Sequence, residues 1–218
     1  MTPQTEIPFA VVTGASSGIG YELARQFAEH GFDLLITSET KRIEETAQRF
    51  RELGAQVEGV RASLATNEGV ETLYAQIRAM RRPIDVMVIN AGAGVGGQFI
   101  DNDLSAELNL VALNVTAVVH LAKRVVKDMV GRNQGHILFT PSIDEGPARY
   151  EAVQAASKAF VLSFAEALQN ELKDTNVGVT ALRAGASAAD FFHRARTDDT
   201  KFAAEQRGEL PEPGSANA

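Results

Sequence analysis

The sequence contains no cysteine among its 218 residues. This absence excludes disulfides, thiolate catalysis and thiolate-bound metal sites. Positive charge is also scarce, because 21 lysine and arginine residues stand against 28 aspartate and glutamate residues and leave a formal net charge of −7. A negative chain repels phosphate backbones and anionic membrane surfaces. We therefore expect neither nucleic acid nor a membrane as a partner.

Long apolar runs are missing as well. The opening "MTPQTEIPF" lacks a basic stretch followed by an apolar one, and no run approaches the roughly 18 apolar residues of a membrane span. The histidines are few and scattered without metal-ligand spacing, at His30, His120, His136 and His193. We therefore predict a soluble, cytoplasmic protein without a metal site.

Short apolar runs alternate with helical patterns along the chain. The run "FAVVTG", rich in valine and closed by glycine, is typical of a strand buried on both faces. The patterns predict strands over residues 9–13, 33–38, 56–62, 84–90, 136–140 and 177–182, and helices over 17–30, 42–53, 67–80, 104–130 and a segment that contains Gln154. The fold class is therefore α/β, with a parallel sheet covered by helices on both faces.

The length and the 44% hydrophobic content suit one domain rather than two. We assign that domain to residues 1–206. The polar residues 207–218 are predicted to be a disordered tail.

The segment "TGASSGIG", residues 13–20, joins the first strand to the first helix. Glycines at 14, 18 and 20 permit positive φ and let backbone amides approach a pyrophosphate, which the helix amino terminus attracts. The alternative is a tight strand-to-helix turn with no ligand. No "GKS" or "GKT" follows, so the segment does not match a P-loop of nucleotide hydrolases.

Several motifs occur in one order on the expected elements. After "TGASSGIG" come "INAG" at residues 89–92, Asn114, Ser142 and "ASK" at residues 156–158. This set resembles the short-chain dehydrogenase/reductase family over residues 9 to about 195. The resemblance implies a Rossmann-type, doubly wound parallel sheet of six strands in the order 3-2-1-4-5-6, in three αβα layers, with a nicotinamide dinucleotide at the carboxyl ends of the strands.

The resemblance also implies the residues of the cofactor site. They are Gly14, Ser16, Ser17, Gly18, Ile19, Gly20, Glu39, Ser63, Leu64, Asn90, Ala91, Gly92, Lys158 and Gly185. Glu39 is placed to accept hydrogen bonds from a ribose diol and to repel a 2′-phosphate, which favours NAD(H) over NADP(H); the alternative is a solvated loop carboxylate. Ser63 replaces the aspartate usual in the family, and Ala184 replaces the proline before Gly185, so weakened cofactor binding is expected.

The catalytic set of the family comprises an asparagine, a serine, a tyrosine and a lysine. Asn114, Ser142 and Lys158 match, whereas Gln154 stands at the tyrosine position. A carboxamide cannot supply a proton near neutral pH, and general acid catalysis is worth about 10²- to 10⁴-fold in rate. It can still donate a hydrogen bond to a carbonyl oxygen. Tyr150 and His193 are the alternative proton donors.

Three functions follow from this pattern. The first is an NAD(P)-dependent oxidoreductase acting on a carbonyl or secondary alcohol, with impaired activity; the second is a catalytically inactive dinucleotide-binding or regulatory relative; the third is a non-redox enzyme using the same cleft. A small apolar carbonyl or alcohol substrate is expected from the candidate cleft residues Val95, Gln98, Phe99, Tyr150, Phe191 and Phe192. The family's usual last helix and strand have no counterpart here, so a homo-oligomer would lack the usual C-terminal dimer element.

Overall fold

A computed structural model of the chain describes residues 7–141 and 150–182. These residues lie within one compact unit, residues 1–184. The predicted single domain, residues 1–206, extends past the last described residue, Leu182. The predicted tail, residues 207–218, lies entirely outside the described residues, so both assignments stay predictions.

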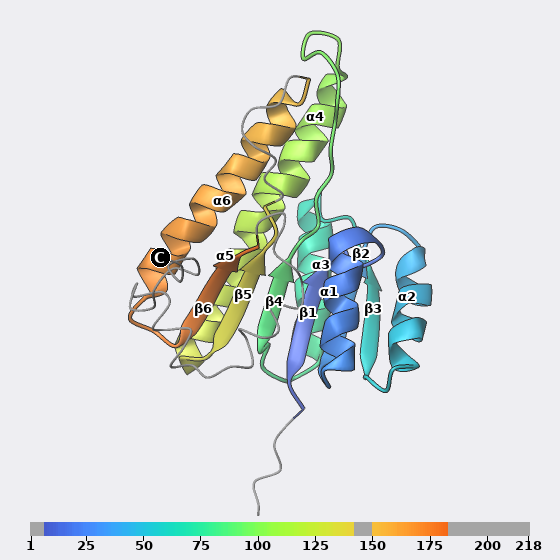
Figure 1. The fold of residues 1–218 in the computed structure, drawn as a ribbon, viewed down its shortest axis with the longest axis vertical. Coiled ribbons are helices and arrows are strands. Elements are labelled where there is room, and N and C mark those ends of the chain that lie inside the picture. The colour runs from blue at the N-terminus through green and yellow to red at the C-terminus, as the bar shows by residue number, and fades with distance from the viewer. Residues whose placement is uncertain (1–6, 142–149, 183–218) are drawn as a thin grey trace, which may run out of the picture. The chain divides into compact units, whose positions relative to one another are not determined.

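A six-stranded parallel sheet forms the middle of the fold (Figure 1). The strands are β1 (Phe9–Thr13), β2 (Asp33–Ser38), β3 (Val57–Arg61), β4 (Val86–Ile89), β5 (Gly135–Phe139) and β6 (Val177–Ala181). Their order is β3-β2-β1-β4-β5-β6, and every neighbouring pair is parallel. The predicted Rossmann-type topology is confirmed.

The central strands are buried on both faces, which explains their continuous apolar sequences. Every residue of β1, β2 and β4 is buried. The edge strand β3 alternates instead, with Val57 and Val60 buried and Glu58 and Arg61 exposed. Helices on both faces of a parallel sheet account for the first pattern, and an edge position accounts for the second.

The helices are α1 (Gly18–Glu29), α2 (Arg42–Arg51), α3 (Asn67–Ala79), α4 (Leu104–Val111), the π-helix η1 (Ala112–Thr116), α5 (Ala117–Arg132) and α6 (Ala152–Leu172). In Figure 1, α1 and α2 cover one face of the sheet, and α3 and α5 cover the other. The largest buried cluster packs α3, α5 and α6 against the sheet, with Leu73, Leu121 and Val161 among its members. This is the three-layer arrangement that the alternating pattern predicts.

The segment predicted as one helix over residues 104–130 is interrupted. It continues to Arg132, but five residues, Ala112–Thr116, form a π-helical turn between α4 and α5. Such insertions are frequently found at functional sites. The simple apolar periodicity of the segment gave no sign of the π turn, and Asn114 lies inside it.

The same segment, Leu104–Arg132, is long and apolar enough to cross a membrane by length and composition, with a mean hydropathy of 1.4. Its buried side chains form one face that packs in the sheet core, including Leu121, Val125 and Met129. The core helices of globular α/β proteins meet the same criteria, and the packing of α5 on the sheet accounts for these residues.

Candidate functional site

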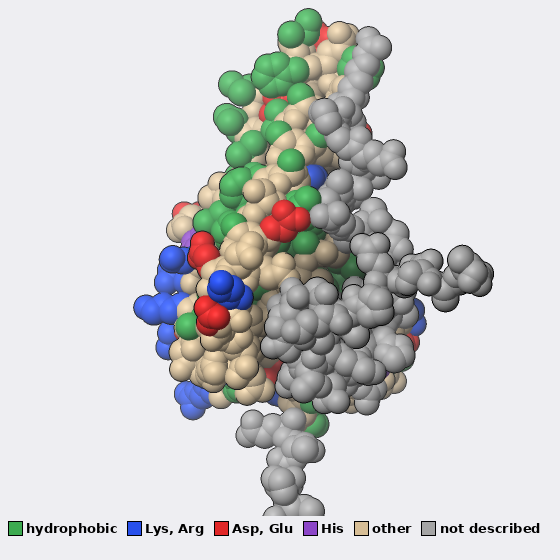
Figure 2. Space-filling view, turned by 60° about the vertical axis from the view of Figure 1, so that its left-hand side comes forward, with side chains coloured by type: hydrophobic (Ala, Val, Ile, Leu, Met, Phe, Trp, Pro, Cys, Tyr) green, Lys and Arg blue, Asp and Glu red, His purple; other side chains and the backbone are tan. Residues whose placement is uncertain are grey.

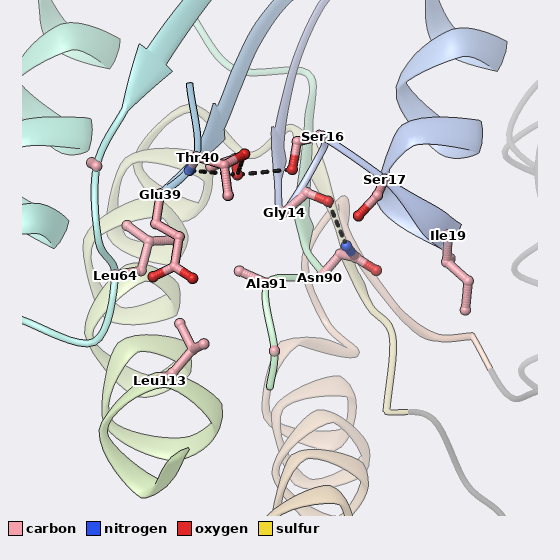
Figure 3. Close-up of a pocket in the computed structure, with 13 residues that line it drawn as sticks. Gly14, Ser16, Ser17, Ile19, Glu39, Thr40, Leu64, Asn90, Ala91 and Leu113 are labelled. Atoms are coloured by element: carbon pink, nitrogen blue, oxygen red, sulfur yellow. Dashed lines mark hydrogen bonds between the residues drawn. The ribbon is translucent and has the colours of Figure 1, made fainter. Parts of the chain in front are cut away.

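A cleft of about 360 Å³ opens at the carboxyl ends of the strands, beside β1, β2 and β4 (Figure 3). Its size falls in the range of small-molecule and cofactor sites. The lining residues are Gly14, Ser16, Ser17, Ile19, Ser38, Glu39, Thr40, Ala62, Leu64, Asn90, Ala91, Gly92 and Leu113. Nine of them are among the predicted cofactor residues; Ser38, Thr40, Ala62 and Leu113 are not.

The glycine turn leaves the amino terminus of α1 open toward the cleft. Ser17 precedes α1 in extended conformation, its side chain makes no capping hydrogen bond, and the first turn of the helix has no acidic residue. The backbone amides of this turn and the positive end of the helix dipole therefore remain available for an anion. Gly18 has φ +59°, a conformation that favours glycine.

Gly20 is required by close packing rather than by its backbone angles. A Cβ at Gly20 would lie 2.3 Å from the Asn90 amide nitrogen Nδ2 and 2.4 Å from the Gly14 carbonyl oxygen. No heavy atom fits at these distances. The glycine turn is thus pressed against Asn90 at the end of β4, and its shape depends on that contact.

Asn90 joins the two halves of the cleft by hydrogen bonds. Its Nδ2 donates to the carbonyl oxygens of Thr13, at 3.1 Å, and Gly14, at 3.4 Å. Thr13 Oγ1 accepts from the backbone N–H groups of Asn90 and Ala91. Thr140, after β5, donates its hydroxyl to Asn90 Oδ1 at 2.9 Å. The sequence predicted Asn90 and Ala91, but it did not identify Thr13 and Thr140 as their partners.

A group of hydroxyls lies at the outer end of the cleft. The Ser16 and Ser38 hydroxyl oxygens are 2.9 Å apart, and Ser38 Oγ accepts from the backbone N–H of Thr40. Glu39 lies between Ser38 and Thr40 in the sequence. Its carboxylate points into the cleft between Leu64 and Ala91 (Figure 3). The Glu39 carboxylate is therefore placed where it can contact a ligand that binds in this cleft.

The residues after β3 that line the cleft are apolar. Ala62 and Leu64 line it together with Leu113 of η1. Ser63 does not line the cleft; its carbonyl oxygen accepts from Thr66 Oγ1 at 3.2 Å near the start of α3. The predicted role of Ser63 at the ligand edge has no support in this arrangement, and it remains a prediction.

Asn114 is buried, with 2% of its surface exposed, and links three segments. Its Oδ1 accepts from the Ala93 N–H at 2.9 Å, and its Nδ2 donates to the Ala93 carbonyl oxygen at 3.0 Å and to Ser157 Oγ at 2.9 Å. Ser157 in turn donates to the Gln154 carbonyl oxygen at 2.7 Å. Asn114 therefore fixes the loop after β4 against α6.

Lys158 lies on the inner side of the same junction. A Cβ added to Gly92 would lie 3.2 Å from Lys158 Nζ and 3.3 Å from Asn114 Oδ1, so these groups converge on the Gly92 backbone. Burial lowers the pKa of Lys158 below its usual value. A cavity of about 10 Å³, lined by Asn114, Thr140 and Lys158 among others, has room for about one water molecule.

Gln154 occupies the position on α6 one turn before Lys158. Its Nε2 donates to Glu151 Oε2 at 3.3 Å. Its Oε1 lies against the backbone of Gly94, where an added Cβ would be only 2.4 Å away. The amide therefore lies between the loop after β4 and the start of α6.

Several predicted site residues fall outside the described residues. They are Ser142, Gly185, Phe191, Phe192 and His193. Tyr150 is described: it has φ +70°, 47% of its surface is exposed, and its carbonyl oxygen accepts from the Gly97 N–H at 2.8 Å. Its position beside the loop after β4 agrees with an aromatic residue near the substrate end.

Known proteins with similar sequences and folds identify the lineage. A family model for short chain dehydrogenases matches residues 8–200. The NADP-dependent 3-hydroxy acid dehydrogenase YdfG of Salmonella typhi is 31% identical over 195 residues, which cover 88% of this chain and 78% of that relative.

Two solved structures carry the same architecture. L-Sorbose reductase from Gluconobacter frateurii, complexed with NADPH and L-sorbose, matches with a TM-score of 0.75 at 31% identity, over 81% of this chain and 68% of that one. A short-chain dehydrogenase/reductase from Burkholderia phymatum in complex with NAD matches with a TM-score of 0.75 at 27% identity, over 81% and 64% of the two chains. With a family match over almost the whole chain and the predicted strand order in place, the chain belongs to the short-chain dehydrogenase family of oxidoreductases.

Proposed function

We propose that the protein binds a nicotinamide dinucleotide and oxidises or reduces a small apolar secondary alcohol or ketone, at a rate reduced by the glutamine at the tyrosine position. The observation that carries the proposal is the continuous arrangement from the open end of α1, through Asn90, to Asn114 and Lys158. A dinucleotide is the ligand whose phosphates and two ribosyl groups suit such a row of sites.

The residues present fit this cofactor. The amides at the start of α1 have no side-chain cap, and a Cβ added at Gly18 would meet no atom within 4 Å, so this turn has open space and donors for a pyrophosphate. Glu39 would hold a ribose at the outer end, and Lys158 would hold the other ribose. When bound, the cofactor supplies or accepts the hydride.

We propose NAD(H) as the preferred form. The support is the Glu39 carboxylate, which borders the cleft and would repel the 2′-phosphate of NADP(H). The relatives differ in this respect: the sorbose reductase structure contains NADPH, and the Burkholderia structure contains NAD. Fluorescence titration with NADH and NADPH tests the preference, and tighter binding of NADPH would contradict it.

The substrate end supports an apolar ligand. Beyond the carboxyl ends of the strands, α4 and the start of α6 project past the sheet (Figure 1), and hydrophobic side chains gather on this projection (Figure 2). Exposed apolar side chains there include Phe99, Ile100, Leu104 and Leu108. An apolar alcohol or ketone would cover part of this surface on binding.

The chain's own groups would polarise the reacting oxygen but supply its proton poorly. Gln154 offers an amide N–H, which can donate a hydrogen bond and cannot ionise near neutral pH. Lys158, whose pKa is lowered by burial, would stabilise negative charge nearby. Loss of the ionisable hydroxyl is expected to reduce the rate about 10²- to 10⁴-fold relative to a site with tyrosine.

Reversal of the substitution tests the proposal. We expect Gln154→Tyr to raise kcat for a ketone about 10²-fold or more while the NADH affinity stays within about threefold, because the scaffold around the side chain is intact. The measurement is NADH oxidation with cyclohexanone and acetophenone, together with fluorescence titration. Failure of the wild-type chain to bind either NADH or NADPH at millimolar concentration would overturn the proposed function.

A second candidate is a dinucleotide-binding protein without turnover. The observation in its favour is that one Gln154 N–H is already bound to Glu151. Cofactor binding without any activity in wild type, and activity in Gln154→Tyr, would select this candidate.

A further inference from the structure

The residue before α6 is a glutamate that faces the side chain at the tyrosine position. Glu151 has a non-helical backbone, φ −137° and ψ 33°, and makes no side-chain capping bond to α6. Its Oε2 instead accepts from Gln154 Nε2 at 3.3 Å, and the residue is partly buried. The carboxylate is therefore held beside the side chain at the tyrosine position.

The contacts of the Gln154 amide define its orientation. A carboxylate can only accept hydrogen bonds, so the nitrogen of the amide must face Glu151. The amide oxygen accordingly lies against Gly94. Because an amide nitrogen carries two N–H groups, one remains to donate to a substrate oxygen.

The geometry of one amide nitrogen fixes how far its two acceptors lie from each other. Two oxygens that accept the two N–H groups of one nitrogen are about 5 Å apart, a separation that one bridging water spans. The substrate oxygen on Gln154 and the Glu151 carboxylate would stand in this relation. A base within hydrogen-bond reach through one water is suitable for general acid–base catalysis.

The other titratable groups of the described residues near Glu151 have different tasks. Glu107 of α4 is buried and accepts from an asparagine of the preceding loop, and Asp103 caps α4. Lys158 lies about two turns farther along α6 than Glu151, and burial lowers its pKa. Tyr150 adjoins Glu151 in the chain. Among these groups, Glu151 is the carboxylate in contact with Gln154.

We propose that Glu151 is the proton acceptor of this site when a secondary alcohol is oxidised. The alcohol O–H bond breaks, and its proton passes through one water to the Glu151 carboxylate. The C–H electron pair leaves as hydride to the oxidised nicotinamide dinucleotide, which is thereby reduced, and the C=O bond forms. Gln154 holds the oxygen throughout by its second N–H. This inference rests on the proposed function and adds the group that moves the proton.

Glu151→Gln is the main test, with Glu171→Gln as the matched control on an exposed position of the same helix. Wild type and both variants are assayed with cyclohexanol and phenylethanol and with NAD⁺ and NADP⁺, from about pH 5 to about pH 9. We expect Glu151→Gln to lower kcat/KM about 10²-fold or more and to remove the rise of rate with pH on the acid side. Glu171→Gln is expected to stay within about twofold of wild type.

The Gln154→Tyr variant, used as a second background, distinguishes proton transfer by Glu151 from a structural effect of this residue. In Gln154→Tyr, the tyrosine can take the proton, so adding Glu151→Gln is expected to change kcat/KM by less than about threefold. A purely structural role of Glu151 would cause similar losses in both backgrounds. Fluorescence titration of NADH with all chains checks that the cofactor site is unchanged.

The free protein provides a readout that needs no turnover. We expect the side-chain amide NMR signals of Gln154, identified by their loss in Gln154→Tyr, to shift with pH in wild type because this amide donates to the Glu151 carboxylate. The shift should vanish in Glu151→Gln and persist in Glu171→Gln. Absence of the shift in wild type would contradict the contact on which the proposal is built.

The outcomes separate this proposal from the function on which it rests. If Glu151→Gln keeps wild-type activity, the role of Glu151 is overturned and the proposed oxidoreductase function stands. If cofactor binds and Gln154→Tyr is active while wild type is inactive, the role of Glu151 is overturned as well, and the dinucleotide-binding protein without turnover is selected. If no chain binds either cofactor, or none turns over any alcohol of the panel, the proposed oxidoreductase function fails and the role of Glu151 fails with it.

Discussion

The two halves of the sheet differ in how the residues at their carboxyl ends are packed. On the side of β3, β2 and β1, the glycine turn is packed so closely that an added Cβ at Gly20 would lie 2.3 Å from Asn90. On the side of β4, β5 and β6, Gln154 is partly buried, and its side-chain amide donates to Glu151, three residues away. The first region tolerates almost no change of shape, whereas the second orients its key side chain by a hydrogen bond to a neighbour on the same segment and by contact with Gly94.

The difference shows which parts of the site the fold itself maintains. Asn90 bonds to the turn after β1 and to Thr140 after β5, and Asn114 joins the loop after β4 to α6. Replacement of such residues disturbs several segments at once. The side chain at position 154 touches the surface of this network without being part of it, so the fold survives a glutamine there.

The largest effect is expected where the first region is broken. In Gly20→Ala, the Cβ meets the Gly14 carbonyl at 2.4 Å, so the turn or β4 must move. Overpacking of this kind costs roughly 1–3 kcal/mol and more where backbone cannot yield. We expect a lower thermal midpoint and a loss of NADH affinity on the order of 100-fold, measured by thermal unfolding and fluorescence titration.

The control for this substitution is Gly131→Ala in α5. An added Cβ at Gly131 meets no atom within 4 Å, and the residue is helical. Alanine is favoured over glycine in a helix by about 0.5–1 kcal/mol, so the midpoint should rise and cofactor affinity should not change. Equal losses in both variants would show that the turn is not specifically required.

In the second region, the largest loss of stability is expected when Asn114 is replaced. Asn114→Ala removes three hydrogen bonds and leaves the Ala93 and Ser157 groups without this partner. Each buried polar group left unsatisfied costs roughly 1–3 kcal/mol. We expect unfolding at lower urea concentration and a fall of kcat in the Gln154→Tyr background, where the expected activity is higher than in wild type.

The same variant should leave the glycine turn largely intact, because the Asn114 side chain bonds to Ala93 and Ser157 and not to the turn in the described part of the chain. NADH affinity is therefore expected to fall less than in Gly20→Ala. If Asn114→Ala abolished binding as completely as Gly20→Ala does, the two halves would not be separable.

The sequence alone predicted the architecture because its strand, turn and helix patterns all indicated the same α/β fold. Valine-rich runs, glycine ends and helical periodicity set all six strands within about two residues of their observed bounds. The topology followed from the resemblance and is confirmed by the strand order. Asn90, Asn114, Gln154 and Lys158 were also expected to belong to one site; Asn90, Asn114 and Lys158 line one small cavity, and the functional roles of all four stay predictions.

Other features depend on contacts that periodicity does not encode. The π turn around Asn114 arises within an otherwise regular apolar helix pattern. Thr13, Thr140 and Ser157 matter through hydrogen bonds to residues far away in the chain, and their types are ordinary for strand ends and helices. The role of Ser63 was implied by the resemblance to the family and stays a prediction; in the structure its carbonyl oxygen accepts from Thr66 Oγ1.

A smaller effect is expected at acid pH between β5 and β6. His136 Nε2 lies 2.8 Å from Thr180 Oγ1, and burial lowers the pKa of His136 from 6.5 to about 4. The unfolded chain therefore binds this proton more readily than the folded chain. Stability is full above about pH 6.5 and is lost as pH falls toward 4, by roughly 1–3 kcal/mol.

Urea unfolding between these pH values measures the loss. His136→Asn removes the titrating group, so part of the pH dependence in this window should disappear even if the variant is less stable overall. An unchanged pH dependence in His136→Asn would assign the effect to other groups. NADH affinity, which depends on the opposite half of the sheet, should follow the folded fraction and nothing more.

The smallest effect is expected outside both halves of the cleft, between α3 and α5. Glu71 pairs with Arg124 at 2.6 Å and with His120 at 2.7 Å, and hydrogen bonds from these two side chains lower the pKa of Glu71. The pairs are exposed to solvent, so water and salt screen them. We expect Glu71→Gln to move the thermal midpoint by less than about 2 °C at low salt, and by even less at high salt, with NADH affinity unchanged. A midpoint loss as large as that of Asn114→Ala, insensitive to salt, would mean that the contact between α3 and α5 supports the cleft after all.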